Sequence, residues 1–297
     1  MNFRKVERKQ AKLRMALTGV SNSGKTMGAL KIAKGMGGKL FFINTEKEGP
    51  DVYDDLFADN PFDVWDIHAP YSPEKYIEAI RACEKAGAEI IIIDSLSHAW
   101  AGTGGILDIQ DAKTKASNNK NSYMAWRDVT PLHNRLVDTI LQSSAHIIVT
   151  MRSKTHHEIM EINGKKTPVK IGLAPIQRDG LEYEFTLMLE IDHSSHLFNT
   201  SKDRTRLFEG RNEIISQSHG QEIVDWLNKG TPVRDNREIL EEIQKKFEEC
   251  HDLTQLRHAF EEAFRNHPIL KLEIIELKNI KKLEIEQLEI LRNVEAA

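Results

Sequence analysis

Short apolar runs alternate with segments of helical spacing along most of the chain. The first apolar runs have the length of buried strands and occupy residues 15–18, 39–44, 62–67 and 89–95. Residues Ile90–Ile93 are β-branched and apolar on both faces, which is typical of a central strand in a parallel sheet. Helical spacing covers residues 26–34 and 73–86, and Ser72 is placed to cap the second of these helices. The alternation predicts an α/β fold with a mostly parallel central sheet flanked by helices.

Two long polar insertions interrupt this alternation. Residues 102–122 are rich in Gly, Ser, Asn and Lys, so we expect a mobile loop with a short helical piece at residues 106–113. The second insertion covers residues 152–180, and within it Asn163-Gly164 predicts a hairpin turn. The pattern around the insertions predicts a helix at 123–141, with Pro131 marking a kink or a helix start, and strands at 146–151, near 183–191 and at 197–200.

The composition changes after Gly230-Thr231-Pro232. Beyond this break, charged segments with apolar residues three and four positions apart predict helices at residues 237–249, 253–265 and 270–294. We therefore expect a core at residues 1–230 and a small helical tail at residues 231–297. Such a tail either packs on itself or recruits a partner protein or a sister subunit, and its pattern leaves these alternatives open.

The 297 residues carry a net charge of −4, and no apolar run approaches the length of a membrane span. The first residues are basic and polar and lack the apolar centre of a signal peptide, so we expect a cytoplasmic protein with no membrane partner. Cys83 and Cys250 have no companions at metal-ligand spacing and are expected to be reduced thiols. The charge argues against a globally basic nucleic-acid coat, so any DNA contact would be local.

One segment fits the phosphate-binding pattern G-x-x-x-x-G-K-[ST] without a mismatch: Gly19-Val20-Ser21-Asn22-Ser23-Gly24-Lys25-Thr26. It lies between a predicted strand and a predicted helix, which is the context that the pattern requires. The glycines allow a tight turn whose N–H groups point at a phosphate. Lys25 would reach the β- and γ-phosphates, and the Thr26 hydroxyl would bind Mg²⁺. The segment predicts a nucleoside triphosphate site, with ATP as the expected ligand.

Acidic residues follow two of the predicted strands. Asp94 ends the Ile-rich strand, and beside a phosphate-binding loop it would complete the Mg²⁺ site. Glu46 follows the strand at 39–44 and would activate the water that attacks the γ-phosphate. Glu48 is its rival for this role, and solvated loop positions are the alternative for both.

Lys202 and Arg204 are two residues apart at the end of a late strand, so both side chains can project in one direction. Such a pair can hold a γ-phosphate. Because the pair lies far along the sheet from Lys25, we expect it to complete the site of a neighbouring subunit in a homo-oligomer. A solvated pair of surface charges is the alternative.

The order of these motifs resembles the RecA-type ATPase core, and Lys202-Asp203-Arg204 resembles the lysine-x-arginine finger of DnaB and RadA-like rings. The chain is still more similar to the phage nucleotide-binding protein family, whose members are RecA-like AAA-type ATPases encoded beside phage recombination genes. This similarity covers about residues 12–230 and is carried by the strings Trp126–Pro131, Thr150–Thr155, Gly172–Phe185 and Ser201–Thr205.

The resemblance implies that the insertions at 102–122 and 152–180 contact single-stranded DNA. Both contain basic side chains that can neutralise phosphates: Lys113, Lys115, Lys120, Arg152, Lys154, Lys165, Lys166 and Lys170. Aromatic rings are scarce there, so contact with the DNA backbone is the expected mode, and merely solvated loops are the alternative. RecA senses the γ-phosphate with a glutamine near the position of Thr150 to Arg152. We hypothesise that Gln177 or Arg178 has this role here.

We therefore expect an ATPase that acts with Mg²⁺ in phage-type DNA recombination or single-strand annealing, as a ring or filament, with a single-strand-binding or recombination protein as a further partner. The alternatives are a nucleotide-gated binding module with little turnover and a ring-shaped DNA motor. His156-His157 and His193/His196 lack the other ligands of a metal site, and Trp100 and Trp126 are expected to pack against other side chains.

Overall fold

The computed structural model describes residues 10–47, 49–117, 121–162, 165–230, 236–267 and 270–295. Side chains are described for these residues except 156–162, 165–171, 236–237 and 288–295. The predictions for Glu48, Lys120 and the turn Asn163-Gly164 therefore lie outside the described residues, as do those for the side chains of His156, His157, Lys165, Lys166 and Lys170. The chain divides into two compact units, Met1–Thr231 and Pro232–Ala297.

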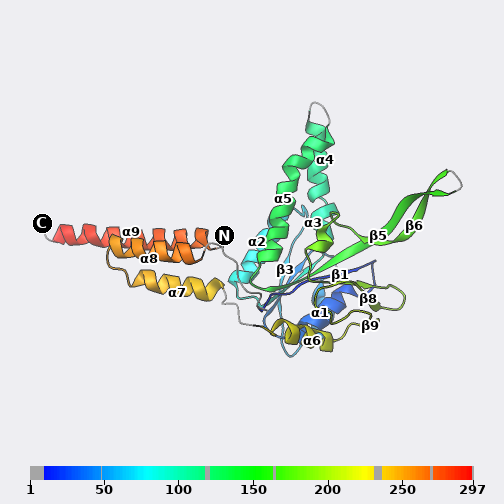
Figure 1. Ribbon diagram of the computed structural model, residues 1–297, viewed down its shortest axis with the longest axis horizontal. Helices are drawn as coiled ribbons and strands as arrows, with labels where there is room; N and C mark the ends of the chain where they lie inside the picture. Colours follow the sequence, from blue (N-terminus) through cyan, green and yellow to red (C-terminus); the bar gives the residue numbers. More distant parts are fainter. Residues whose placement is uncertain are drawn as a thin grey trace, which may run out of the picture. The chain divides into compact units, whose positions relative to one another are not determined.

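The first unit contains a sheet whose strands follow the order β3-β2-β4-β5-β1-β7-β8-β9, with β6 paired to β5 (Figure 1). The strands are β1 (Arg14–Gly19), β2 (Leu40–Asn44), β3 (Asp63–Asp66), β4 (Ile90–Asp94), β5 (His146–Ile162), β6 (Lys165–Pro175), β7 (Leu187–Ile191), β8 (Leu197–Asp203) and β9 (Glu213–Ile214). The strands from β3 to β7 in this order run parallel, whereas β8 and β9 pair antiparallel. The predicted α/β fold with a mostly parallel central sheet is confirmed.

Helices cover both faces of the sheet because successive strand residues point to opposite sides. Ile90 and Ile92 belong to one core cluster with α1 (Lys25–Met36) and α6 (Gln217–Leu227). Ile91 and Ile93 belong to a second cluster with α2 (Pro73–Lys85) and α5 (Ser122–Gln142). Burial of such a side chain contributes about 1.5–3 kcal/mol. The Ile-rich strand β4 therefore joins two separate apolar layers.

The short helical piece predicted at residues 106–113 is confirmed and extends to Ala116, so the mobile loop predicted for the rest of residues 102–122 is wrong for most of the segment. After α3 (Ser97–Ala101), residues Ile106–Ala116 form α4, which packs along α5 as a helical hairpin extending from the sheet (Figure 1). Gln110 is buried between these helices, and its Nε2 donates to Ser122 Oγ at 2.8 Å. The Asn121 side chain accepts from the N–H groups of Tyr123 and Met124 and so caps α5. Pro131 lies inside α5 and does not start it.

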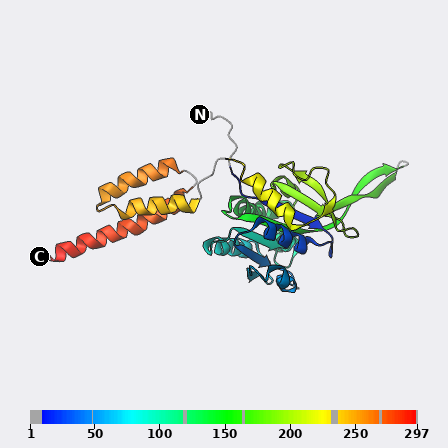
Figure 2. The same cartoon turned by 90° about the horizontal axis from the view of Figure 1, so that it is seen from below.

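The second insertion forms a long antiparallel ribbon. Strand β5 continues from the parallel sheet into a ladder with β6 that runs from Ser153 opposite Pro175 to Ile162 opposite Lys165. Figures 1 and 2 show this ribbon extending away from the sheet. Residues Leu181–Tyr183 form the 3₁₀ turn η2, so the strand predicted near 183–191 begins only at Leu187.

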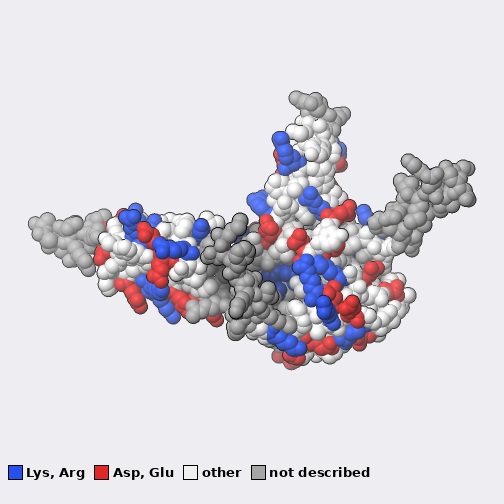
Figure 3. Space-filling model, in the orientation of Figure 1, with Lys and Arg blue, Asp and Glu red and all other residues white. Residues whose placement is uncertain are grey.

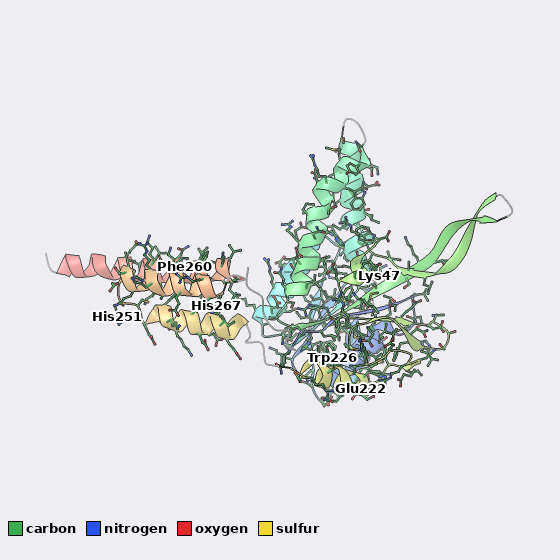
Figure 4. All side chains as sticks on the ribbon, viewed as in Figure 1. Lys47, Glu222, Trp226, His251, Phe260 and His267 are labelled. Atoms are coloured by element: carbon green, nitrogen blue, oxygen red, sulfur yellow. The ribbon has the colours of Figure 1, made fainter. Side chains whose placement is uncertain are left out.

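The second unit consists of α7 (Asn236–Glu248), α8 (Leu253–Asn266) and α9 (Lys271–Glu295), which lie side by side in Figures 1 and 2. The unit has its own apolar core, which includes Phe247, Leu256 and Ile274. Phe260 of α8, labelled in Figure 4, packs against this core. Figure 3 shows both signs of charge interspersed over the described surface of these helices. None of the helices in the described part of the chain combines the length and apolarity needed to cross a membrane.

His146, at the start of β5, is held in its neutral form. Its Nδ1 accepts a hydrogen bond from the backbone N–H of Leu13 at 3.0 Å, which requires an unprotonated nitrogen. Burial, followed by the charges of Lys12 and Arg14, lowers the pKa of His146 to about 3. In the unfolded chain the pKa returns to about 6.5. Below pH 6.5 the unfolded state therefore binds a proton that the native state does not.

The free energy of unfolding should consequently fall as the pH drops from 6.5 towards 3, by up to about 1.4 kcal/mol per pH unit from this side chain. Urea unfolding at pH 5.0, 6.0 and 7.0 measures the slope. In His146→Gln the side-chain oxygen can still accept the Leu13 hydrogen bond but cannot titrate, so its slope should be smaller than that of the parent. Equal slopes would show that His146 is not the titrating group.

Candidate functional site

The predicted phosphate-binding loop connects β1 to α1, in the strand–loop–helix context that the sequence required. Gly24 immediately precedes α1 with φ of +97°, a conformation that residues with a Cβ rarely adopt. A Cβ on Gly19, whose φ is +154°, would stand 2.4 Å from Ser23 Oγ. The loop therefore depends on Gly24 for its backbone geometry and on Gly19 for both backbone geometry and space.

The N-terminus of α1 is suited to binding an anion. The first turn of α1 contains no acidic residue and has no side-chain cap, so its N–H groups remain available. The Oγ of Ser23 is buried and has no hydrogen-bond partner among the described residues. Lys25 Nζ donates to the carbonyl of Val20 at 2.7 Å, and burial lowers the pKa of Lys25 against the opposing charge of Asp94. The N–H groups of the first turn and the Lys25 amino group at the cavity fit a bound phosphate.

Thr26 and Asp94, predicted as magnesium ligands, lie together. Thr26 Oγ1 donates to Asp94 Oδ2 at 2.5 Å, and Thr150 donates to Asp94 Oδ1. Burial raises the pKa of Asp94, and the two hydroxyl hydrogen bonds oppose that shift. Carboxylate and hydroxyl oxygens are ligands that suit Mg²⁺. The sequence did not predict Thr150 as a partner of Asp94. Its place in β5 could have indicated this, because β5 lies two strands from β2 and directly beside β4, which ends in Asp94.

Glu46 lies in the loop after β2 and forms an ion pair with Arg152 of β5. Arg152 Nε donates to Glu46 Oε1 at 3.2 Å, and a second guanidinium nitrogen of Arg152 contacts Glu46 Oε2. The side chains are 44% exposed for Arg152 and 25% exposed for Glu46, so the pair is accessible from the adjoining cavity. Both carboxylate oxygens of Glu46 are therefore engaged by one guanidinium group.

Lys25, Thr26, Asp94, Glu46 and Arg152 all line one cavity of about 720 Å³. Its volume lies within the usual range for small-molecule sites. Aromatic side chains complete the wall: Tyr53 in the 3₁₀ turn η1 (Pro50–Phe57), and Tyr71, which stacks on His98 at a ring distance of 4.8 Å. These rings were missed from the sequence because they lie in short turns between the predicted elements. Lys47, labelled in Figure 4, also lines the cavity.

Lys202 and Arg204 lie together but away from this cavity. Because β8 runs antiparallel to β7, Lys202 pairs with Met188, which in turn lies beside Ala16 of β1, and neither Lys202 nor Arg204 lines the cavity. Lys202 Nζ and Arg204 both donate to the carbonyl of Tyr183, at 2.5 and 3.3 Å. The two cations thus point to the same side, as the sequence predicted.

Neither residue hypothesised as a γ-phosphate sensor lines the 720 Å³ cavity. Gln177 is buried and donates to the carbonyl of Leu96, and the Arg178 guanidinium lies 6.0 Å from the Trp126 ring. Trp126 also stacks on Trp100, so the expected packing role of these two rings is confirmed. The cation at the cavity wall on β5 is Arg152.

Other predicted positions have ordinary surroundings. On the α4–α5 hairpin, Lys113 pairs with Asp128 and Lys115 with Asp111, whereas Lys154 is exposed on β5. His196 contacts the Ser23 carbonyl at 3.1 Å. Within the described part of the chain, no group of three or more His, Cys, Asp or Glu residues is placed to hold a metal ion.

Comparison with known proteins assigns the chain to a protein family. None of the curated proteins compared with the chain matches it. A family model described as AAA domain matches residues 11–219, which include the phosphate-binding loop, Glu46, Asp94 and the strands from β1 to β9. The chain therefore belongs to the AAA domain family, a family of AAA-type P-loop nucleotide-binding ATPases.

Proposed function

We propose that the protein hydrolyses ATP with Mg²⁺ and uses the hydrolysis cycle on single-stranded DNA in phage-type recombination or strand annealing. The convergence of Lys25, Thr26, Asp94 and Glu46 on one cavity carries the catalytic part of this proposal. These groups are the phosphate clamp, the metal ligands and the carboxylate that phosphoryl transfer to water requires.

Each group has a distinct role. The N–H groups of the loop and Lys25 Nζ bind the phosphate oxygens and offset their charge. Thr26 and Asp94 hold Mg²⁺, which when bound neutralises charge that develops on the phosphates. Glu46 orients the attacking water and accepts its proton. The ring of Tyr53 provides a face on which the adenine base can stack.

The DNA part of the proposal is supported by the two extensions of the first unit and by the resemblance to RecA-type proteins. The α4–α5 hairpin and the β5–β6 ribbon both project from the sheet (Figure 1). Strand β5 is continuous from Arg152, at the cavity, into the ribbon that carries Lys154. A nucleotide-dependent change at the cavity can thus be transmitted along the backbone of β5 to Lys154, one of the proposed DNA contacts.

Lys202 and Arg204 are proposed to serve a second copy of this chain. Neither side chain lines the cavity that contains Lys25, and both donate to the Tyr183 carbonyl, which supports a role outside the site of their own subunit. A guanidinium supplied by a neighbour can stabilise the transition state of phosphoryl transfer. ATP hydrolysis would then depend on assembly into a ring or filament.

One observation favours a second function, a nucleotide-gated binding module with little turnover. Glu46 is engaged through both carboxylate oxygens by Arg152 and is not free to bind water. If that pair persists after ATP binds, the protein would hold the nucleotide without hydrolysing it. The proposed partner of such a module is a single-strand-binding or recombination protein.

The decisive experiment is the steady-state ATPase rate with and without single-stranded DNA, at 50 and 200 mM NaCl. We expect stimulation by DNA that weakens at the higher salt concentration, because phosphate contacts release counterions. Glu46→Gln is the control: it should bind ATP and lose about 100-fold or more of the stimulated rate. ATP binding with no turnover above this control, for any DNA, would favour the binding module.

The same assay tests the contribution of the neighbour. Lys25→Ala and Arg204→Ala should each be inactive alone. Mixing them should restore part of the activity, because an Arg204→Ala subunit with an intact loop can receive Arg204 from a Lys25→Ala neighbour. A mixture as inactive as its components, with both variants folded and assembled, would show that Arg204 does not act in trans.

A further inference from the structure

We propose that a second cavity of this protein binds a small organic cation, an apolar body that carries one amino group, through the carboxylate of Glu190. The cavity has a volume of about 530 Å³ and shares no lining residue with the 720 Å³ cavity at the phosphate-binding loop. This inference goes beyond the proposed function and does not depend on it, since it concerns neither ATP hydrolysis nor DNA.

The second cavity lies on one face of the sheet, where the segment 173–183 returns from the β5–β6 ribbon. Thr18 of β1 lies beside both Met151 of β5 and Glu190 of β7 in the parallel register, so these three side chains share one face. All three line the cavity, and the returning segment supplies the apolar side chains of Leu173, Pro175 and Leu181. Much of the wall is therefore apolar, which fits an apolar ligand body.

A β-bulge in β8 adds two further side chains to the wall. The ladder between β7 and β8 shifts register and leaves Ser201 as an extra residue. Successive strand residues usually point to opposite faces, yet Ser201 and Lys202 both line the cavity. The Lys202 amino group donates to two backbone carbonyls of the turn η2 and so closes one side of the cavity. The cavity is thus shaped by an irregularity in the pairing of the strands.

Glu190 has no cation beside it. Its side chain is half-buried, and no described side chain donates a hydrogen bond to its carboxylate or forms an ion pair with it. Burial, followed by the negative charge of Asp192, raises the pKa of Glu190. The two cations of the wall are engaged elsewhere, Lys202 by backbone carbonyls and Arg178 by the Trp126 ring. The carboxylate therefore lacks the partner that a buried charge requires.

An ammonium group on a ligand would supply that partner. Hydrogen bonds between an ammonium group and a carboxylate are charge-assisted and stronger than neutral ones. Asp179 and Glu182 also line the cavity, so its acidic side chains outnumber its basic ones, which disfavours anions such as phosphate. The volume of about 530 Å³ lies within the usual range for small-molecule sites. Charge, wall and volume together select a small organic cation.

Methionine methyl NMR with benzylamine as the probe tests the proposal. Met151 and Met188 line the second cavity, whereas Met27 lines the cavity at the phosphate-binding loop. The signals are assigned with Met151→Leu, Met188→Leu and Met27→Leu. We expect benzylamine to shift the methyl signals of Met151 and Met188 to saturation and to leave that of Met27 unchanged. No shift of Met151 and Met188 up to the solubility limit of benzylamine, or an equal shift of Met27, would overturn the site.

Benzyl alcohol is the neutral counterpart of the probe, with the same ring and no charge. It should bind to the parent protein about tenfold more weakly than benzylamine, the loss expected for a hydrogen bond between charged groups. Equal affinity for the two compounds would show that the cavity does not select a cation. This comparison needs no variant, so it holds even if a substitution disturbs the fold.

Glu190→Gln removes the charge and keeps the size of the side chain. It should weaken benzylamine about tenfold and leave benzyl alcohol within about twofold. Glu184→Gln is the matched control, because Glu184 is an exposed carboxylate outside the cavity, and it should leave both affinities unchanged. Unchanged benzylamine binding in Glu190→Gln would mean that another group holds the cation and would overturn the proposal.

A last probe separates a small molecule from a protein side chain as the source of the cation. Acetyl-lysine amide, acetylated on its α-amino group, presents the amino group of a lysine side chain on a polar body, so it should bind more weakly than benzylamine. Tighter binding would assign the cavity to a protein partner and overturn the proposal. None of these measurements uses ATP or DNA, so the proposed ATPase stands or fails separately.

Discussion

Lys25→Ala should reduce the affinity for ATP and ADP strongly and reduce ATP hydrolysis to the background rate. Lys25 supplies the amino group that lies over the phosphate-binding loop, at the edge of the cavity shared with Asp94 and Glu46. Loss of a cation that contacts the charge developing on a phosphoryl group costs about 100-fold or more in kcat/KM. Isothermal titration with ATP and ADP, followed by steady-state ATPase measurements, gives both quantities. Lys47→Ala is the matched control, because Lys47 is an exposed cation on the same cavity (Figure 4).

The fold of Lys25→Ala should remain intact. Lys25 is buried, and burial lowers the pKa of its amino group, so the charged side chain gains little from its position in the absence of a phosphate. Its hydrogen bond in the described structure goes to the Val20 carbonyl of the same loop. The circular dichroism spectrum and melting temperature of the variant should match those of the parent. If ATP affinity were unchanged, the loop would not be the phosphate site; if the protein unfolded, Lys25 would have a structural role.

The parts of the site that the sequence predicted are those encoded locally. The phosphate-binding loop is a contiguous pattern, and Asp94 ends a strand whose β-branched composition is evident without neighbours. Because the carboxyl ends of parallel strands meet at one edge of a sheet, Asp94 and Glu46 could be placed near Lys25 before the fold was known. The alternation of strands and helices gave the fold class for the same reason.

The parts that the sequence did not predict depend on contacts between distant segments. Arg152 was assigned to a DNA-binding insertion, and nothing in the local pattern indicates that it pairs with Glu46, 106 residues earlier. The sequence indicated only a short helical piece at residues 106–113 within a loop; the full helix α4 and its packing depend on α5, through contacts such as that of Gln110 with Ser122. Composition describes what a segment can do alone, and both features exist only after the chain folds.

Two glycines at the crossing of α1 and α6 should be among the positions most sensitive to substitution. A Cβ added to Gly220 of α6 would lie 2.1 Å from the Ile32 carbonyl oxygen, and one added to Gly35 of α1 would lie 1.8 Å from that of Gln217. Both obstacles are backbone atoms, which cannot rotate away as a side chain can. The helices therefore approach more closely than any residue larger than glycine allows.

We expect Gly220→Ala to lower the free energy of unfolding by about 3 kcal/mol or more, above the usual cost of an overpacked core, because relief requires the two helices to separate. Helix α6 cannot slide easily: Ser216 and His219 form its capping box, and the His219 ring packs against Phe198 and Phe208. Urea unfolding measures the loss. Gly28→Ala is the matched control, because its new Cβ would meet the flexible end of Ile215 at 3.0 Å and should change stability by less than about 1 kcal/mol.

The close approach of α1 and α6 should also affect nucleotide binding. Helix α1 begins at Lys25 and carries Thr26 in its first turn, so a shift of α1 away from α6 also moves both residues relative to Asp94 on β4. The part of the Gly220→Ala protein that remains folded should bind ATP more weakly than the parent, whereas Gly28→Ala should bind it equally well. Equal affinity in a destabilised Gly220→Ala variant would mean that the clash is relieved by movement of α6 alone. Weaker affinity would show that the close approach of two glycines, on the sheet face opposite α2 and α5, fixes the position of the phosphate-binding residues.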